Sequence, residues 1–545
     1  MGGWRWKDLG IRPLVFPVLA LGIGSAVPGL VRAWPALAAC LAALLPIGAF
    51  VLRTRPGAHL ALLLGACLTG SLLATRAERS TTLPTGVPVL LEGRLVSVDV
   101  GDRGGRAVLE IARVDGMPAR ARSRLWWSDP ELHPWAGQRA QLRAELRADV
   151  GPESWGQYDV GAAARARGLV TSGRIVPGSF IPLSRPEPWR RWVTEHRESF
   201  GRWAHARLAS SDDAALVGAL AAGLRSELGP TWEDRFARSG LAHVLSVSGL
   251  HVAALALVLA ALLSGLFRAI PGILRRIDPR RPAALAALPL VWGYVVFTGN
   301  QPPAARSALM LSAVLVGRAL QRHTDALNAL ALAAGVLLVV DPASVRDLSL
   351  QLSFTAVLAL VLLAPRLRRL IPVPTPDLQR PERWRRVLEQ AREALLAVCT
   401  ASAAVTLASI PLVATAFHRV SLVGWAVNVV ALPVASVLTL ACAGTAGAFC
   451  LAPARASAPL VVASIASRLL LALVRAGAAV PFGVLPTPAF AWPAALAFGA
   501  GLLGVALGVR RAGWVVALAT AFVLVHPLLA PRPPLEVTAL PVGHG

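Results

Sequence analysis

The chain has 545 residues, of which 55% are hydrophobic and only 15% are charged. Several apolar stretches approach or exceed the ~20 residues that an α-helix needs to cross a bilayer, which excludes a soluble globular protein. The formal net charge is +24. Many arginines lie in short loops between apolar runs, where they set membrane topology, so the charge alone does not indicate a nucleic-acid partner.

Residues 1–75 are predicted to contain N-terminal transmembrane segments. The apolar runs cover roughly 13–31, 34–52 and 58–74. The first run resembles a cleaved signal peptide in position. Its length and the two runs that follow it favour an anchor that stays in the membrane.

Residues 76–186 are predicted to form a small β domain. Apolar and polar residues alternate over 89–98, 107–114 and 139–146, as in short strands with one buried face. Basic and aromatic side chains suited to single-stranded nucleic acid are Trp126, Trp127, Trp135, Arg120, Arg122 and Arg124. Because adjacent residues of a strand point to opposite faces, at least one of the paired tryptophans is expected in the core.

Residues 187–240 are predicted to form amphipathic helices at the membrane interface. The pattern from about 188 to 209 is helical and places several tryptophans together. Tryptophan is typical of the membrane–water boundary, which favours a membrane-surface role over base stacking here.

Ten further apolar segments fill residues 241–530. They cover roughly 242–267, 283–299, 303–320, 326–340, 345–364, 393–416, 421–450, 456–480, 484–508 and 512–529. With the N-terminal runs the total is about thirteen, of which 421–450 is long enough to bend around Pro433. We therefore predict a polytopic α-helical membrane protein of about 11–13 transmembrane helices with an extracytoplasmic small β-barrel domain.

The arginines predict the orientation. If each apolar segment crosses once, the arginine-rich connections all fall on one side, and the opposite short loops are poorer in positive charge. The positive-inside rule then places 76–240 and the C-terminus outside the cytoplasm.

The segment that opens the fourth apolar run has an unusual composition. Its first turns contain His243, Ser246, Ser248, Gly249 and His251. Imidazoles are costly in lipid and face protein or water there, so we favour a pore-lining role over satisfied packing. The two histidines are eight positions apart, so they do not lie on one stripe of a straight helix. A kink at Gly249 would realign them.

This segment resembles the signature of the ComEC-type competence proteins. The family pattern is similar to H-L-L-A-I-S-G-L-H-V, and the chain has H-V-L-S-V-S-G-L-H-V over 243–252. A second block, 298–310, resembles T-G-x-x-x-x-x-x-R-A-x-x-M, with Ser307 in place of the alanine and Arg306 as the arginine. Arg306 could reach the membrane interface or receive a phosphate, and both roles stay open.

Three further blocks follow in the family's order. Residues 325–332 resemble D-x-L-N-x-L-x-L, 350–354 resemble F-Q-L-S-F, and 421–433 resemble S-x-x-x-x-x-x-N-x-x-x-x-P. Their polar members are Asn328, Gln351, Ser353 and Asn428. Such side chains line a path or join helices by hydrogen bonds, and both readings stay open.

The resemblance implies an OB-like fold for the β domain and a channel that takes up single-stranded DNA during natural transformation. It implies as partners a separate cytoplasmic DNA-translocating ATPase, an extracytoplasmic DNA receptor and nuclease, and the lipid bilayer. Residues 531–545 resemble the first strand of the family's metallo-β-lactamase-like domain, which we expect to be truncated here.

We predict no enzyme activity and no cofactor. Lys7 is the only lysine, so no phosphate-binding loop follows it, and the five cysteines show no C-x-x-C spacing. Three alternatives stay open: a transporter of another anionic solute or lipid, a membrane-embedded enzyme using the two histidines, and a membrane scaffold with a degenerate channel.

Overall fold

The computed structural model describes residues 15–26, 66–67, 69–71, 83–101, 104–129, 132, 134–148, 169, 171–245, 249–270, 278–321, 326–371, 383–487, 492–509 and 512–529. The first predicted apolar run contains helix α1 (Val15–Ala26). The predictions for 34–52, most of 58–74 and 531–545 lie outside the described residues, as do Ser246 and Ser248.

The β domain is a six-stranded sheet whose strands are β1 (Pro88–Gly101), β2 (Gly104–Val114), β3 (Met117–Trp127), β4 (Arg139–Ala148), β5 (Thr171–Ile175) and β6 (Ile181–Pro182). Their order is β1-β2-β3-β5-β4-β6, and β1 also pairs with β4. These pairings close a ring of five strands, in which β3 and β5 are parallel and the other neighbours antiparallel. The predicted strands at 89–98, 107–114 and 139–146 are confirmed as β1, β2 and β4.

Alternating side chains of these strands fill the interior of the β domain. The fully buried leucines are Leu91, Leu95, Leu109, Leu125, Leu142 and Leu146. Trp127 is 4% exposed and its Nε1 donates to the Leu132 carbonyl at 3.1 Å, whereas Trp126 is only half-buried. The expectation that one tryptophan of the pair belongs to the core is confirmed.

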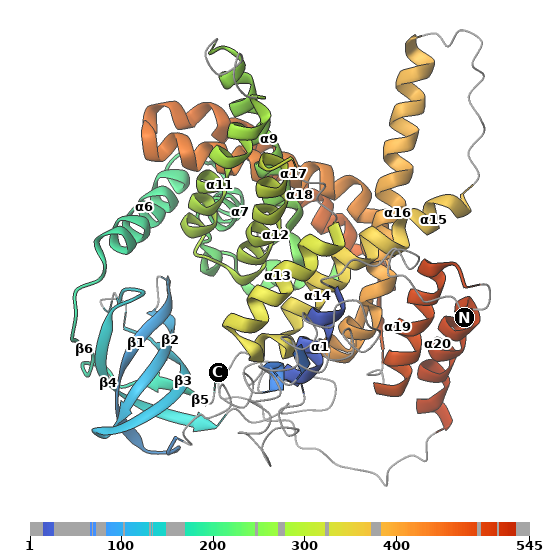
Figure 1. Cartoon of the computed structure of the whole chain (residues 1–545). Coiled ribbons are helices and arrows are strands. Elements are labelled where there is room, and N and C mark those ends of the chain that lie inside the picture. Colours follow the sequence, from blue (N-terminus) through green and yellow to red (C-terminus); the bar gives the residue numbers. More distant parts are fainter. Residues whose placement is uncertain are drawn as a thin grey trace, which may run out of the picture.

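Three helices connect the β domain to the rest of the chain (Figure 1): α6 (Pro188–His205), α7 (Ser211–Ala222) and α8 (Pro230–Arg238), with the short η2 (Arg225–Glu227) between the last two. α6 and α8 each bury one face, as the amphipathic pattern predicts. α7 differs because residues 213–222 are all buried. A helix that is apolar on all sides belongs inside a protein, and α7 packs against α17 and α18 of the helical part.

The helical part begins with η3 (Ala242–Val244), α9 (Gly249–Arg268), α11 (Arg280–Phe297), α12 (Pro302–Ala319) and α13 (Ala326–Val340). It continues with η4 (Pro342–Arg346), α14 (Leu348–Leu358), the π-helical η5 (Ala359–Leu363), α15 (Ala364–Leu370) and α16 (Arg383–Phe417). It ends with β7 (Arg419–Ser421), α17 (Gly424–Leu451), η6 (Pro453–Ala456), α18 (Ser457–Ala479), β8 (Val484–Pro486), α19 (Trp492–Leu507) and α20 (Ala512–Leu529).

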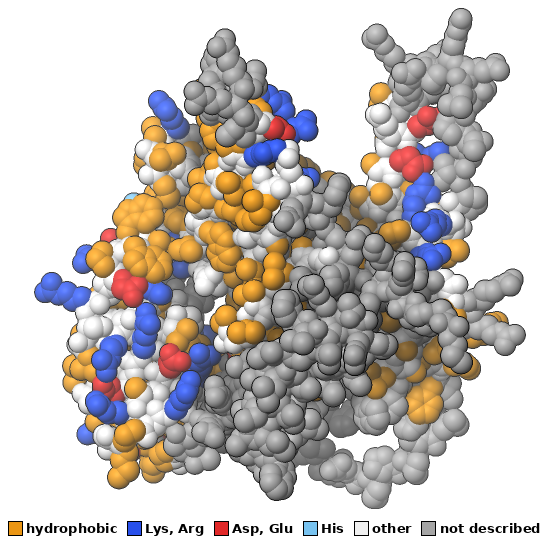
Figure 2. Space-filling view, in the orientation of Figure 1, with side chains coloured by type: hydrophobic (Ala, Val, Ile, Leu, Met, Phe, Trp, Pro, Cys, Tyr) orange, Lys and Arg blue, Asp and Glu red, His pale blue; other side chains and the backbone are white. Residues whose placement is uncertain are grey.

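Each of the ten apolar segments predicted after residue 241 contains helix. Five helices of the described part are long and apolar enough to cross a membrane, namely His251–Arg268, Leu348–Leu370, Val387–Phe417, Gly424–Leu451 and Pro453–Ala479. Shorter apolar helices lie at Ala326–Val340, Ala494–Ala506 and Ala512–Phe522. Many of their large apolar side chains face outward, among them Leu257, Leu262 and Leu266 of α9. The chain is therefore a polytopic helical membrane protein, and hydrophobic side chains cover much of the helical surface in Figure 2.

Contacts between the segments that connect the helices show that the helices alternate in direction. β7 and β8 pair, so the connection before α17 meets the one after α18. Arg366 of α15 donates a hydrogen bond to the Ala506 carbonyl at the C-terminal end of α19. The C-terminal end of α9 and the N-terminal end of α16 both point away from the β domain (Figure 1).

Candidate functional site at the start of α12

The N-terminal end of α9 lies directly against α12. A Cβ atom on Gly249 would stand 2.7 Å from Oγ of Ser307, closer than side chains pack. Ser307 is 5% exposed, and its hydroxyl donates to the Pro303 carbonyl at 2.9 Å. Gly249 is therefore explained by the close approach of two helices, because glycine has no Cβ.

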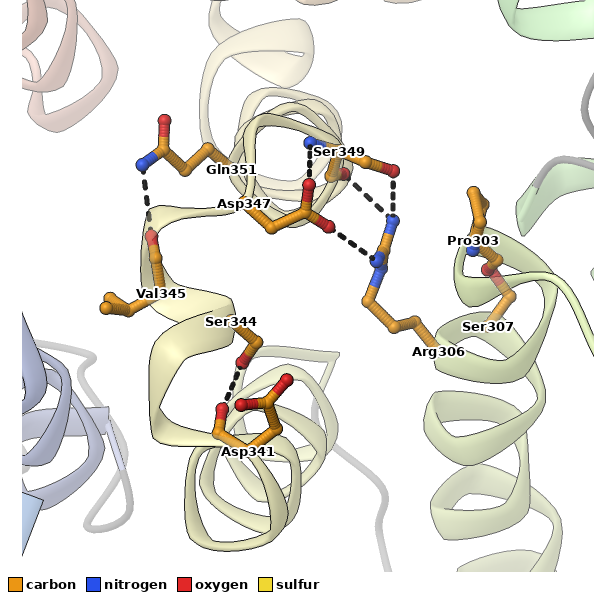
Figure 3. Close-up of polar contacts among 9 residues, drawn as sticks. All are labelled: Pro303, Arg306, Ser307, Asp341, Ser344, Val345, Asp347, Ser349 and Gln351. Carbon is orange, nitrogen blue, oxygen red and sulfur yellow. Dashed lines mark hydrogen bonds and ion pairs between the residues drawn. The ribbon is translucent and has the colours of Figure 1, made fainter. Parts of the chain in front are cut away.

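Arg306 is a buried cation held by the start of α14 (Figure 3). It is 3% exposed. Its Nη2 donates to the carbonyl of Ser349 at 2.9 Å and to the hydroxyl of Ser349 at 2.7 Å. Its Nη1 lies 3.7 Å from Oδ2 of Asp347. A buried charge requires such pairing, and in this structure the guanidinium binds α14 instead of reaching a membrane surface.

The two carboxylate oxygens of Asp347 make different contacts. As the N-cap of α14, its Oδ1 accepts from the Ser349 backbone N–H at 3.3 Å, while its other oxygen faces Arg306. Gln351 donates from Nε2 to the Val345 carbonyl at 3.0 Å, which ties α14 to η4. Arg306 is thus joined to a connection that is itself fixed by hydrogen bonds.

Asp347 and Ser349 were not among the predicted site residues. A signal was present, because an aspartate directly before an apolar run, with serine two residues later, is typical of a helix N-terminus. The pairing with Arg306 needs a fold that brings positions about forty residues apart together, and local pattern does not contain it.

His243 and His251 are not on one helix. His243 lies on η3 and α9 begins only at Gly249. The His251 side chain is fully buried and His243 is exposed, yet the two lie close enough to interact electrostatically. His243 also forms a hydrogen bond with the Gly240 backbone. The two imidazoles therefore come from two separate elements, η3 and α9.

The start of α17 reaches the same segment. A Cβ atom on Gly240 would stand 2.5 Å from the Cα of Gly424, and the Ser421 hydroxyl donates to the Arg238 carbonyl at 2.9 Å. One turn further, the side-chain oxygen of Asn428 is buried and accepts no hydrogen bond from any described residue. α17 itself runs without interruption through Pro433.

Not every motif residue joins this cluster. Ser353 is half-buried on α14, and Asn328 lies in the first turn of α13 with a buried side-chain oxygen. Within the described residues, no group of three or more histidine, cysteine, aspartate or glutamate side chains could hold a metal ion.

Comparisons with known proteins agree with the motif pattern. A family model described as "Competence protein" matches residues 220–512, which is more than half of the chain. The chain belongs to the ComEC-type competence protein family. No solved structure was found to match it.

Three curated proteins are similar to this competence protein. It is 30% identical over 293 residues to the "Competence protein ComA" of Neisseria gonorrhoeae, which covers 51% of this chain and 39% of the relative. It is 25% identical over 250 residues to the "ComE operon protein 3" of Bacillus subtilis, with 46% and 28% covered. It is 26% identical over 311 residues to the "Uncharacterized protein YcaI" of Escherichia coli, with 56% and 37% covered. The match therefore spans well under half the length of each relative.

Proposed function

We propose that this competence protein is a membrane channel that carries single-stranded DNA into the cytoplasm during natural transformation. The observation that carries the proposal is the family match over 220–512, because that range includes most of the helical part and every motif block. The contacts that join four of those blocks at the starts of α9, α12, α14 and α17 support it.

We propose that the β domain is an OB-like barrel on the outer face of a bacterial inner membrane. The closed ring of strand pairings and the parallel β3–β5 pair support the barrel. The arginine-rich connections support the orientation through the positive-inside rule. A total of about 11–13 membrane spans is part of this proposal.

Different motif residues are proposed to contribute in different ways. His243 is exposed and close to a second imidazole, which suits a hydrated path, and Ser246 and Ser248 directly follow its short helix. Arg306, His251 and Gln351 are proposed to hold the helices that border this path. Asn328, Ser353 and Asn428 are further candidates. The unpartnered oxygen of Asn428 supports contact with water, since a buried acceptor without a partner costs about 1–3 kcal/mol.

The proposed transport needs partners. No lysine follows Lys7, so the phosphate-binding loop of a motor is not encoded in these residues. We propose that a separate cytoplasmic ATPase draws the strand inward. An extracytoplasmic DNA receptor and a nuclease are proposed to deliver a single strand from duplex DNA.

The path can be tested with His251→Asn and Arg306→Lys in a strain that lacks the natural gene. Uptake of labelled DNA should fall by more than the amount of protein in the membrane falls. Equal losses of uptake and protein would support a packing role only. Wild-type uptake in folded variants at His243, Ser248, His251 and Arg306 would contradict the proposed path.

A further inference from the structure

The register of the β domain gathers arginines around one outward tryptophan. Trp126 of β3 lies opposite Arg106 of β2 on one side and Arg174 of β5 on the other. These three residues form one row across three strands. In the next row, Arg124 of β3 and Arg147 of β4 lie on either side of Ser172.

We call these five residues, Arg106, Arg124, Trp126, Arg147 and Arg174, the Trp126 face. Arg106, Arg147 and Arg174 are exposed, and Arg124 and Trp126 are half-buried. None of the four arginines forms an ion pair within 4 Å with a carboxylate whose side chain the structure describes. Carboxylates border the face instead: Asp99 of β1 lies opposite Arg106, and Glu145 lies opposite Arg174. Beside the face, Glu110 pairs with Arg122 at 3.2 Å.

The other tryptophans that the structure describes in the β domain do not offer such a surface. Trp127 belongs to the core, and Trp135 lies 5.9 Å beneath the guanidinium of Arg191. The two exposed tryptophans of α6, Trp189 and Trp192, belong to a separate helix. Figure 2 shows arginines over the visible side of the β domain with acidic side chains among them, so net charge alone does not mark a site.

We propose that the Trp126 face binds single-stranded DNA, with one base stacked on Trp126 and neighbouring phosphates bound by the arginines of the two rows. Single-strand sites combine a basic surface with an aromatic platform, and stacking needs an unpaired base. A single aromatic centred among four cations fits this chemistry better than a lipid surface, where clustered tryptophans are typical. The inference rests on the proposed function, because it assigns the transported DNA strand a binding surface on the β domain.

The test measures binding of a fluorescent oligothymidylate to the full chain in neutral-lipid nanodiscs. Trp126→Ala should weaken binding at least about fivefold, the lower end of the stacking contribution per base. Trp126→Phe should restore most of it. Arg106→Ala and Arg174→Ala should each weaken binding and reduce the salt dependence by about 0.7 per lost phosphate contact.

Arg113→Ala is the matched control. It removes an arginine from the same strand as Arg106, seven residues further along, and leaves Glu92 paired with Arg139 at 2.9 Å. Its affinity should stay within about twofold of wild type. An equal loss in this variant would show that binding depends on net charge only, which overturns the assignment.

Three other outcomes would overturn the inference: no binding by the wild-type chain, unchanged binding in Trp126→Ala, or Trp126-dependent binding to phosphatidylglycerol vesicles without oligonucleotide binding. DNA uptake separates this inference from the proposed channel. If Trp126→Ala retains binding and uptake while Arg306→Ala loses uptake, the Trp126 face is wrong and the channel stands. If deletion of the whole gene leaves uptake unchanged, the channel is wrong.

Discussion

At the scale of single residues, contacts between segments distant in sequence determine the surroundings of the motif residues. Arg306 is buried, and the start of α14 supplies its acceptors. Residue 249 is glycine because the Ser307 hydroxyl on α12 leaves no room for a Cβ atom. The sequence pattern identified these positions, but it left the partner of Arg306 open, because that partner is about forty residues away and follows a separate helix.

Removing the charge of Arg306 should destabilise the chain more than removing its serine partner. Arg306→Ala leaves Asp347 without its cation, and breaking a buried pair costs about 3–5 kcal/mol. Ser349→Ala removes only the hydroxyl and keeps the carbonyl acceptor, so a cost of about 1–2 kcal/mol is expected. Thermal unfolding in detergent would measure both, and equal effects would contradict the contact seen in Figure 3.

Gly249→Ala should be harmful and Ser307→Ala should suppress it. The added methyl would meet the Ser307 Oγ at 2.7 Å, whereas the Ser307 Cβ lies at an ordinary 3.6 Å. Overpacking of this kind costs about 1–3 kcal/mol. The midpoint of thermal unfolding should fall in the single glycine variant and recover in the double variant. A double variant as unstable as Gly249→Ala would mean that backbone freedom, not the hydroxyl, requires glycine.

At the scale of elements, α7 lies in the stretch predicted to form amphipathic helices, but it is buried on all sides instead of along one face. It lies in the hydrophilic region, is only 12 residues long, and contains two aspartates. Its apolar residues surround the whole helix, so no amphipathic period marks it. The structure places it between α6 and the α17–α18 pair, where Asp213 accepts from Ser467 at 2.9 Å and from Arg468 at 3.0 Å.

The neighbouring aspartates of α7 provide a matched pair for mutation. Asp213 is 2% exposed, and Asp213→Ala should cost about 1–3 kcal/mol because it leaves a buried hydroxyl and an arginine without their acceptor. The Asp212 side chain is 40% exposed, and among the described residues its ion-pair partner is Arg475 at 3.4 Å, so Asp212→Ala should stay within about 0.5 kcal/mol. Similar losses of thermal stability in the two variants would show that α7 is not docked through Asp213.

In the β domain, Glu92 should make the strands sensitive to acid. Hydrogen bonding to Arg113, with further support from Arg139, holds the pKa of Glu92 below its usual range. A carboxyl with a lowered folded pKa contributes stability above its unfolded pKa of about 4.3, and loses that contribution as the pH falls through the folded value.

Hydrogen exchange of the β1 and β4 amides measures this effect. Protection should decrease on acidification below about pH 4.3, and Glu92→Gln should reduce that pH dependence. Glu110→Gln is the control, because Glu110 is exposed and its one ion pair within the described part of the chain is with Arg122. An unchanged pH dependence in Glu92→Gln would assign the acid sensitivity to other groups.

At the scale of the whole molecule, the sequence predicted the order of the helical segments better than their ends. The ten segments after 241 all contain helix, because runs of apolar residues have few other structures available in a membrane. The apolar segment predicted from 242 begins with the short η3 (Ala242–Val244), and α9 begins at Gly249. The cross-strand rows of the β domain were not predictable, because register depends on bulges in β1 and β2.

Orientation can be measured by cysteine labelling after the native cysteines are replaced. Arg185→Cys, exposed after β6, should react with an impermeant reagent in intact cells stripped of their outer layers. Arg369→Cys, exposed on α15, should react only after the membrane is opened. The reverse pattern would invert the proposed topology.

The central claim is that this chain carries a DNA strand across the membrane, and uptake of labelled DNA tests it most directly. A strain lacking the natural gene should take up no label into the cytoplasm and should regain uptake with the wild-type chain. Arg306→Lys, present at wild-type level in the membrane, should restore much less. Normal cytoplasmic uptake in the deletion strain would contradict the account.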